Sequence, residues 1–390
     1  MSESDFITVE EGLAQLLIPK TCGSTASTRA PVFYNPMMRP CRDVSVLALQ
    51  AYQQTHLTGL QVCDAMSGCG ARGVRYALEV DGVSTVVFND LNPLAVDLIK
   101  RNVALNSVEA RSVVHRLEAN RLFSSYSEPG LRFHVIDLDP FGSPARYLDS
   151  LIRAAKKEGL VMVTATDMAP LSGVHPMTCL KNYGGKPLHT EYVKETAIRL
   201  VVSALVRSAA VQDMAFEPLL CYYQDYYVRA IGSVSYGSRS ASATLRKLGF
   251  ILHCFRCLNR ESVEGFSLPK TCVRCGQPYS IAGPLWLGEL FDTVFLSKME
   301  TILQGMSYPS KKRTARLISC AREEAGLPPT FFLTDALCDR MNIPLPRPAL
   351  VMDALAGIGY RVARSHIDGN AIKTDAPISD VEEAIRYSLA

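Results

Sequence analysis

Short apolar runs alternate with segments of helical periodicity along the first 240 residues of the chain. Runs of aliphatic and aromatic residues predict buried strands, and they occur at residues 60–64, 85–90, 113–117, 133–138, 160–166 and 222–231. Helices are predicted at 44–55, at 74–79 and, with an amphipathic pattern, at about 190–210, and a loop is predicted at 175–187. Strands alternating with helices predict an α/β fold, an open and mostly parallel sheet that helices cover.

The pattern changes beyond residue 240. Helices are predicted at 309–325, 334–341 and 349–357, where prolines and glycines mark their ends, and a strand is predicted at 360–365. Short helices followed by a strand loosely resemble a winged helix. We therefore expect an N-terminal segment (1–45), a Rossmann-like domain (46–245), a small module (246–285) and an α+β C-terminal domain (286–390).

Polar residues stand at the ends of the predicted strands. Residues 68–73 form a G-x-G-x-x-G loop after the first strand, where glycine lets the backbone approach a ligand closely. Asp90 ends the second strand about 20 residues further on, a spacing typical of a carboxylate that binds ribose hydroxyls. Glu118 follows the third strand and Asp139 the fourth, so these positions are expected to meet in one crevice.

The glycine loop and its acid suit either NAD or S-adenosylmethionine, because both ligands carry an adenosine ribose. S-adenosylmethionine is favoured, because no constellation of His and Tyr typical of hydride transfer stands out. An acid-Pro-Phe sequence at the end of the fourth strand also favours the methyl donor.

The sequence Asp139-Pro140-Phe141-Gly142 ends that fourth strand. An exocyclic amine of a base is a poor nucleophile, because its lone pair is delocalised into the ring. A carboxylate beside the amine can accept an N–H hydrogen bond and localise the lone pair, and an aromatic side chain offers a face for stacking. The sequence therefore indicates methylation of a base amine, although a proline loop in which Asp139 caps the next helix would have the same pattern.

Four cysteines have the spacing of metal ligands. Cys254 and Cys257 form one C-x-x-C pair, and Cys272 and Cys275 form a second. Each pair can place two thiolates on one tetrahedral Zn²⁺, and four thiolates leave no open position for water, so the expected zinc is structural. Four reduced, buried cysteines are the alternative. The other eight cysteines show no paired spacing and are expected in the core.

Composition indicates one intracellular protein with ample cores. The chain has 390 residues, 48% hydrophobic content and a formal net charge of +3. No apolar run reaches the ~18 residues of a membrane span, and the acidic start lacks a signal-peptide pattern. We therefore expect a cytoplasmic protein with no membrane contact, and a mildly basic charge permits nucleic-acid binding. Basic residues in the C-terminal domain can contact phosphates or form an ordinary solvated face: Lys311, Lys312, Arg313, Arg316, Arg347, Arg361 and Arg364.

With these motifs the chain resembles the tRNA (guanine-26-N2)-dimethyltransferases of the archaeal type, over nearly its whole length. The segment 137–144 closely matches the family signature, and 173–176 matches a second motif. Residues 32–36 and 42–43 resemble the family's segment near donor and base, and the four cysteines match its zinc site.

The resemblance implies methylation, usually twice, of the exocyclic N2 of a guanosine in tRNA, by a protein expected to be a monomer. By resemblance, the donor-binding positions are Arg42, Arg72, Asp90, Glu118 and Ala119. Asp139 would be the catalytic acid, and Phe33 and Phe141 would sandwich the flipped base. Two positions depart from the family pattern: Cys41 replaces a usual Asn, and Glu118 a common Asp.

Three other functions stay open from the residues. One is a base N-methyltransferase with another target, a different tRNA guanine or DNA adenine. Another is an NAD-dependent oxidoreductase with a structural zinc. The last is a zinc-containing RNA-binding module without activity, which an intact Asp139 disfavours.

Overall fold

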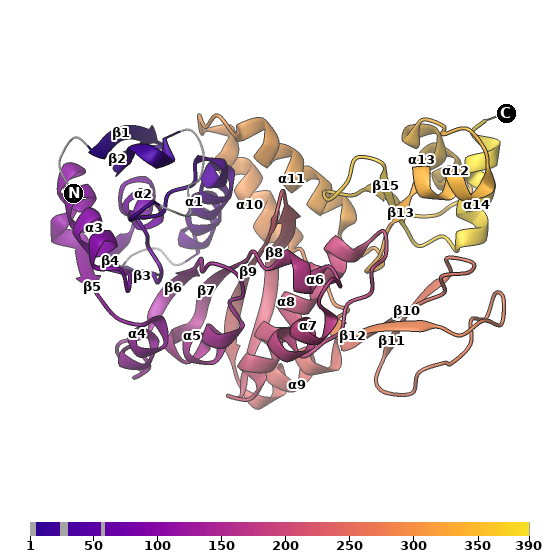
Figure 1. Cartoon of the computed structure of the whole chain (residues 1–390), viewed down its shortest axis with the longest axis horizontal. Coiled ribbons are helices and arrows are strands. Elements are labelled where there is room, and N and C mark those ends of the chain that lie inside the picture. The colour runs from indigo at the N-terminus through magenta and orange to yellow at the C-terminus, as the bar shows by residue number, and fades with distance from the viewer. Residues whose placement is uncertain (1–4, 24–29, 56–58, 390) are drawn as a thin grey trace.

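The computed structural model describes residues 5–23, 30–55 and 59–389 (Figure 1). Most of the acidic start of the chain, residues 1–4, lies outside these ranges. Within the described residues, no helix is both long enough and apolar enough to cross a membrane.

A seven-stranded sheet forms the centre of the protein (Figure 1). In chain order its strands are β3 (Leu60–Asp64), β4 (Val83–Asn89), β5 (Ser112–His115), β6 (Phe133–Leu138), β7 (Ala155–Ala165), β8 (Met214–Gln224) and β9 (Tyr227–Tyr236). They lie side by side as β5-β4-β3-β6-β7-β9-β8. The first five are parallel, β9 pairs antiparallel with β7, and β8 pairs antiparallel with β9 at the edge of the sheet. The predicted α/β fold is confirmed, and the strand order reverses between β3 and β6, where such sheets bind ligands.

The last two strands of this sheet correct the prediction of one strand at 222–231. Gln224 pairs with Tyr227, so a two-residue turn divides the run into the hairpin of β8 and β9. No glycine or proline marks the turn. Asp225 makes it with φ of 51°, a left-handed conformation that Asp tolerates better than most residues.

Helices cover both faces of the sheet. One face carries α1 (Arg39–Gln53), α2 (Ala71–Glu79) and α3 (Pro93–Leu105), and the other carries α4 (Ala119–Ser125), α5 (Leu148–Ala154) and α8 (Val193–Ala210). The sequence predicted α8 as amphipathic, but the helix is buried along most of its length. The reason is that α5, β8, α9 (Ser238–Arg246) and β12 (Ser280–Trp286) all pack against it.

A short helix, α7 (Pro176–Tyr183), replaces most of the loop predicted at 175–187, and a single helical turn, α6 (Met168–Leu171), precedes it. Pro176 stands in the first turn of α7, where its missing N–H costs nothing. Gly184 ends the helix with a left-handed φ of 64°. The prolines and glycines that suggested a loop are therefore the start and stop signals of a helix.

A three-stranded antiparallel sheet carries the four spaced cysteines. Its order is β11-β10-β12, with β10 (Leu248–His253) and β11 (Arg260–Glu264) forming a hairpin that extends away from the central sheet at the lower right of Figure 1. Cys254 and Cys257 lie in the turn between β10 and β11, and Cys272 and Cys275 lie before β12.

The C-terminal unit has the element order of a winged helix. After α11 (Lys311–Glu324) come β13 (Phe332–Leu333), α12 (Thr334–Met341), α13 (Pro348–Gly357), β14 (Val362–Arg364), β15 (Ala371–Thr374) and α14 (Ile378–Tyr387). The three strands pair antiparallel as β13-β15-β14. The predicted helices are present, whereas β15 and α14 were not predicted from the sequence.

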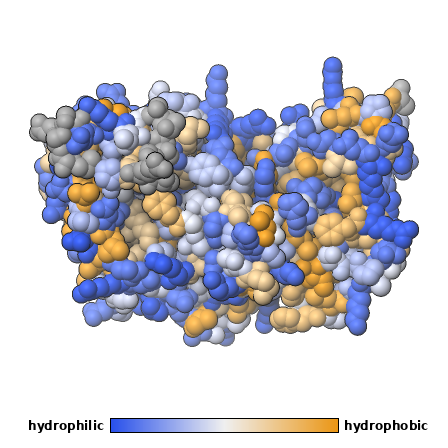
Figure 2. All heavy atoms as spheres, viewed as in Figure 1, coloured by the Kyte–Doolittle hydropathy of each residue, from blue (hydrophilic) through white to orange (hydrophobic). Residues whose placement is uncertain are grey.

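One large core joins the sheet to elements from both ends of the chain. The N-terminal hairpin of β1 (Phe6–Glu11) and β2 (Ala14–Pro19) belongs to it, and so do α10 (Thr293–Gln304) and most of the buried face of α11. A second core lies among β13, β15 and α12–α14, and a third, small one surrounds the cysteines. Short 3₁₀ helices occur at Lys20–Cys22, Pro36–Met38, Glu109–Arg111 and Ala145–Tyr147. On the face seen in Figure 2, hydrophilic residues are interspersed with small apolar groups.

Buried charges connect the C-terminal unit to the central body. The ammonium group of Lys373 in β15 donates to Glu195 of α8 at 2.7 Å and to Glu324 of α11 at 3.2 Å. Glu324 also accepts from Nδ1 of His366 at 2.7 Å, and the side chains of all four residues are almost completely buried. The helices α8 and α11 are thus fixed to the C-terminal sheet by a charged cluster that excludes water.

Candidate active site

The parallel strands bring the predicted site residues to one edge of the sheet. In the register, Asp64 of β3 lies beside Phe88 of β4 on one side and Asp137 of β6 on the other. The residues that follow these strands therefore leave the sheet at the same level, next to the point where the strand order reverses. The glycine loop, Asp90 and Asp139 are brought together in this way.

The loop after β3 is closed by the carboxylate of Asp90. Its Oδ2 accepts the N–H of Gly68 at 2.9 Å, and its Oδ1 accepts the N–H of Asn92 at 2.9 Å. Burial raises the pKa of Asp90, and these backbone hydrogen bonds oppose the rise. Gly70 has a left-handed φ of 83°, and a Cβ on Gly73 would lie 2.2 Å from the ring of Phe88, so both glycines are required by the backbone.

Glu118 and Ala119 start α4 at the next strand end. The Glu118 carboxylate accepts the N–H of Arg121 at 3.2 Å and so caps the helix, and it also accepts from the side chain of Asn120 at 3.0 Å. Ala119 is buried. The cap places a carboxylate at the rim of the crevice without a charged partner among these contacts.

The carboxylate of Asp139 is held by Arg72. Oδ2 of Asp139 accepts from Nη2 of Arg72 at 2.6 Å and from Nε at 3.1 Å. The Asp139 side chain keeps a quarter of its surface exposed, while that of Arg72 is almost buried. The arginine thus fixes the rotamer of the acid and leaves part of the carboxylate accessible from the crevice.

A buried network beneath Asp139 orients Arg72 in turn. Arg229 of β9 donates to both oxygens of Asp137, at 2.9 and 2.7 Å, and the hydroxyl of Tyr76 donates to Asp137 at 2.5 Å. Both Arg72 and Arg229 donate to the hydroxyl oxygen of Ser45 in α1. Burial alone would raise the pKa of Asp137, but the two guanidinium groups outweigh it and lower the pKa. No motif or spacing in the sequence indicates this network.

Phe33 and Phe141 touch each other at the mouth of the crevice. Their ring centroids are 4.7 Å apart and their planes are inclined by 83°, an edge-to-face contact. Phe141 is 74% exposed. The structure brings these two residues together as predicted, but a flat base can enter between the rings only when they separate.

Arg42 lies further back, in a buried clamp. Its guanidinium donates twice to the carboxylate of Glu11, at 2.6 Å each, and once to the carbonyl oxygen of Asn35 at 3.1 Å. It also lies over the ring of Tyr34 at 5.0 Å. Burial would raise the pKa of Glu11, but Arg42 and the neighbouring Arg75 lower it to about 2. These contacts fix the segment that carries Phe33.

Two further carboxylates stand at strand ends, and the sequence alone assigns them no role. Asp64 ends β3 and accepts the N–H of Gly73 at 3.0 Å; burial, with the charge of Asp137, raises the pKa of Asp64 to about 7. Asp167 follows β7 and accepts the hydroxyl of Tyr183 at 2.5 Å. An acid directly after a predicted strand is the available sequence signal for both.

The four cysteines converge on one point. Their sulfur atoms all lie within 4.8 Å of one another, and the Cys254–Cys275 and Cys257–Cys272 pairs are each separated by 3.4 Å. Cys275 is partly exposed and the other three are buried. Four thiolates around one ion at about 2.3 Å each would lie at similar separations, so the donor set fits a tetrahedral zinc.

A sheet of this order, with a glycine loop at the switch point and an acid-Pro-Phe sequence on the neighbouring strand, defines a Rossmann-like class I methyltransferase. Within that class, the chain belongs to the N2,N2-dimethylguanosine tRNA methyltransferase family, whose model matches residues 12–386. The resemblance inferred from the motifs is confirmed. Family membership makes the chain a tRNA guanine-N2-dimethyltransferase and removes the oxidoreductase, the DNA methyltransferase and the inactive RNA-binding module from consideration.

Relatives extend this likeness over the full chain. A tRNA (guanine(26)-N(2))-dimethyltransferase of Methanothermobacter thermautotrophicus is 40% identical, covering 97% of this chain and 98% of its own length. A tRNA (guanine(26)-N(2)/guanine(27)-N(2))-dimethyltransferase of Aquifex aeolicus is 32% identical, covering 96% and 94%. The structure of Trm1 from Pyrococcus horikoshii with S-adenosyl-L-methionine superposes with a TM-score of 0.86 at 36% identity, covering 97% of this chain and 99% of that one.

Proposed function

We propose that this protein transfers two methyl groups from S-adenosylmethionine to the exocyclic N2 of guanosine 26 in tRNA. The family supplies the reaction type, and the relatives named for position 26 support the target. The observation that carries the proposal is the placement of Asp139, which lies at the strand end beside the glycine loop and is locked by Arg72.

The donor crevice fits S-adenosylmethionine. We assign the ribose hydroxyls to Asp90, whose oxygens are already oriented by two backbone N–H groups, and the adenine to the rim formed by Glu118 and Ala119. Bound there, the sulfonium supplies an activated methyl group. The S-adenosylmethionine complex of the Pyrococcus protein supports this assignment.

Arg72 and Arg42 are assigned to the donor side as organising residues. Arg72 connects the glycine-loop helix α2 to Asp139, so donor and acceptor groups share one anchor. Arg42 acts through the segment that it holds, because its guanidinium is engaged with Glu11 and Asn35.

Asp139 is proposed to accept an N2–H hydrogen bond and to take up charge as the nitrogen is alkylated. A positioned acid or base of this kind contributes about 10²–10⁴-fold in rate. The alignment of the nitrogen with the methyl group provides the remainder of the catalysis.

Phe33 and Phe141 are proposed to part and to hold the extruded guanine between them. Extruding a base costs a few kcal/mol, and stacking returns about 1–3 kcal/mol per base. The edge-to-face contact of the two rings keeps this apolar slot closed when no base is present.

Cys254, Cys257, Cys272 and Cys275 are proposed to bind one structural Zn²⁺. The buried sulfur atoms and their mutual distances support a closed four-thiolate site. Such an ion would fix the turn after β10 against the segment before β12.

We further propose that the protein acts on tRNA as a monomer in the cytoplasm. All the assigned donor and catalytic residues come from one chain, and none of the twelve cysteines forms a disulfide, as expected in a reducing compartment.

Mass spectrometry of nucleosides from unmodified tRNA, incubated with the protein and S-adenosylmethionine, tests the proposal. Dimethylguanosine at position 26 is expected, and a tRNA with adenosine at that position should give none. The Aquifex relative makes guanosine 27 a second candidate. Fragment mapping distinguishes the two positions, and a digest without methylated guanosine would refute the proposed function.

A further inference from the structure

The segment that follows β7 is fastened to the segment that carries the acid-Pro-Phe sequence. The N–H of Gly142 donates to the hydroxyl oxygen of Thr166 at 2.8 Å, and the N–H of Thr166 donates to the carbonyl oxygen of Gly142 at 3.0 Å. Asp167 comes next in the chain. A second carboxylate is therefore held beside the loop of Asp139, on the side of the sheet away from the glycine loop.

A chain of hydroxyl groups orients this second carboxylate. Ser143 donates to the hydroxyl oxygen of Tyr183 at 2.9 Å, and Tyr183 donates to Oδ1 of Asp167 at 2.5 Å. Tyr183 is fully buried. Burial, together with the charge of Asp167, strongly raises the pKa of Tyr183, so the tyrosine remains a donor. One oxygen of Asp167 is thus committed to the protein.

The other oxygen has no such partner. Oδ2 of Asp167 is buried and makes no hydrogen bond with any described residue. A buried acceptor without a donor destabilises the folded protein, so such atoms are rare unless a ligand or water supplies the missing hydrogen. Burial raises the pKa of Asp167, and Tyr183, Asn182 and Ser143 oppose the rise.

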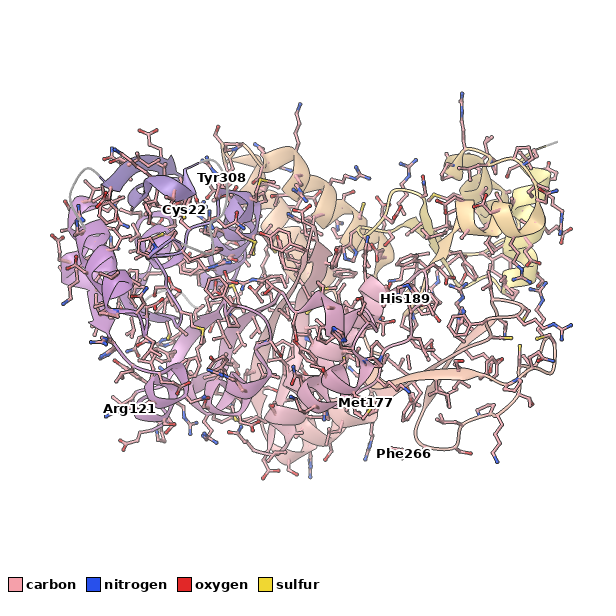
Figure 3. The ribbon with its side chains drawn as sticks, in the orientation of Figure 1. Cys22, Arg121, Met177, His189, Phe266 and Tyr308 are labelled. Atoms are coloured by element: carbon pink, nitrogen blue, oxygen red, sulfur yellow. The ribbon has the colours of Figure 1, made fainter. Side chains whose placement is uncertain are left out.

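An open hollow is lined by neighbours of this carboxylate. Its volume is about 350 Å³, and Phe141, Ser143, Arg146 and Asn182 are among its lining residues. Ser143 and Asn182 are also groups that act on Asp167. Asp167 is not itself part of the lining, but two lining residues connect its carboxyl group to this hollow, which also includes the aromatic residue proposed to stack on the base. Met177, labelled in Figure 3, belongs to α7, the same helix as Asn182.

We propose that Asp167 determines specificity for guanine by accepting the N1–H of the extruded base through Oδ2, while Asp139 accepts N2–H. This inference rests on the proposed function and deepens it. Guanine presents N1–H and N2–H as adjacent donors on its Watson–Crick edge, and two carboxylates on neighbouring strand ends match them. Adenine has an acceptor at N1 and would face a carboxylate. Entry of the base moves Phe141 and, through Gly142 and Ser143, opens the wall in front of Oδ2.

The decisive variant is Asp167→Asn in the full-length protein. Tyr183 still donates to Oδ1, so the amide N–H₂ must occupy the position of Oδ2. That position then changes from an acceptor to a donor. Guanine N1–H would meet a second donor, whereas a base with an unprotonated N1 would gain a partner.

The experiment compares single-turnover methylation of tRNA carrying guanosine or 2-aminopurine at the target position. 2-Aminopurine retains the 2-amino group but has an acceptor at N1. We expect the wild type to prefer guanosine by about 10²-fold or more, and Asp167→Asn to reduce that preference at least about tenfold. Asp149→Asn, an exposed position on α5, is the matched control and should leave the ratio unchanged.

Two results would overturn the inference without touching the proposed function. One is a wild-type enzyme that methylates both bases within about fivefold, a measurement that needs no variant. The other is an Asp167→Asn variant that slows both substrates equally, which makes Asp167 only a support for α7. Methylation of guanosine by the wild type tests the proposed function separately.

Discussion

The pairing of Asp139 with Arg72 governs what a substitution at this position does. In Asp139→Ala the buried guanidinium of Arg72 loses its partner and can move. A lower rate in this variant could then come from the missing carboxylate or from the displaced arginine. An amide keeps the size and one acceptor oxygen but cannot take up a proton. Asp139→Asn is therefore the more informative change.

Asp139→Asn should lower the single-turnover rate of methyl transfer by about 10²–10⁴-fold, the usual contribution of a positioned base. Affinities for S-adenosylmethionine, by calorimetry, and for tRNA, by filter binding, should stay within a few-fold of wild type. A rate within a few-fold of wild type would limit Asp139 to positioning the base.

Folding lowers the pKa of Glu11 from 4.5 to about 2, so its ionised carboxylate stabilises the folded protein at neutral pH. Glu11→Gln should therefore reduce the free energy of unfolding at pH 7 by about 3 kcal/mol. Because the folded-state pKa lies below the unfolded value, this stabilisation is complete above pH 4.5 and is lost as pH falls toward 2. Urea unfolding at pH 7 and pH 3 should show the difference between wild type and variant shrink. The exposed neighbour Glu10 provides the control Glu10→Gln, and a difference independent of pH would contradict the assignment.

Residues at strand ends were predictable, but their partners were not. Asp90, Glu118 and Asp139 each follow an apolar run, so periodicity alone located them. Of the two arginines that neutralise Asp137, the one that donates to both its oxygens is Arg229, which lies 92 residues further along the chain. No local pattern encodes such a pairing, because it depends on the order in which strands join the sheet.

At the scale of elements, two predictions failed. The helix α8 was predicted to have a solvent-exposed face, but neighbouring elements bury most of its residues. The β8–β9 turn was missed because its left-handed residue is an aspartate rather than a glycine. The cysteine module was the opposite case, because ligand spacing is local and was visible in the sequence. Its site geometry follows from two C-x-x-C turns facing each other.

Elemental analysis should find about one zinc per chain, and Cys254→Ser should abolish it, since a closed site needs all four thiolates. The thermal transition should fall in the variant while S-adenosylmethionine affinity is retained, because the donor crevice lies in the central sheet. Cys320→Ser, at a buried thiol in α11 without paired spacing, is the control. A metal-free protein of unchanged stability would refute the site.

At the scale of the whole molecule, the cysteine hairpin and the C-terminal unit lie on the same side of the catalytic sheet (Figure 1). Several of the basic residues predicted to contact phosphates are engaged within the protein: Arg313 pairs with Asp225 and Arg361 with Asp375. Arg347 and Arg364 are exposed on the C-terminal unit. They are the sharper test of an RNA surface there. Phe266, 90% exposed after β11, extends from the hairpin (Figure 3).

The double variant Arg347→Glu/Arg364→Glu should weaken tRNA binding and reduce the slope of log K against log salt by about 2, one for each phosphate that an arginine no longer neutralises. Donor affinity should not change. Lys100→Glu, an exposed charge on α3, controls for net charge. An unchanged slope would place the RNA surface on the central domain.

The cluster of Lys373, Glu195, Glu324 and His366 also bears on how the protein comes apart. Separating the C-terminal unit from α8 and α11 would leave buried charges without partners, a loss of about 3–5 kcal/mol for a broken buried pair. These broken ion pairs alone make detachment of the C-terminal unit unfavourable, in addition to the apolar surface that detachment would expose. The catalytic body and the C-terminal unit should consequently melt in a single cooperative transition, although the two have separate cores.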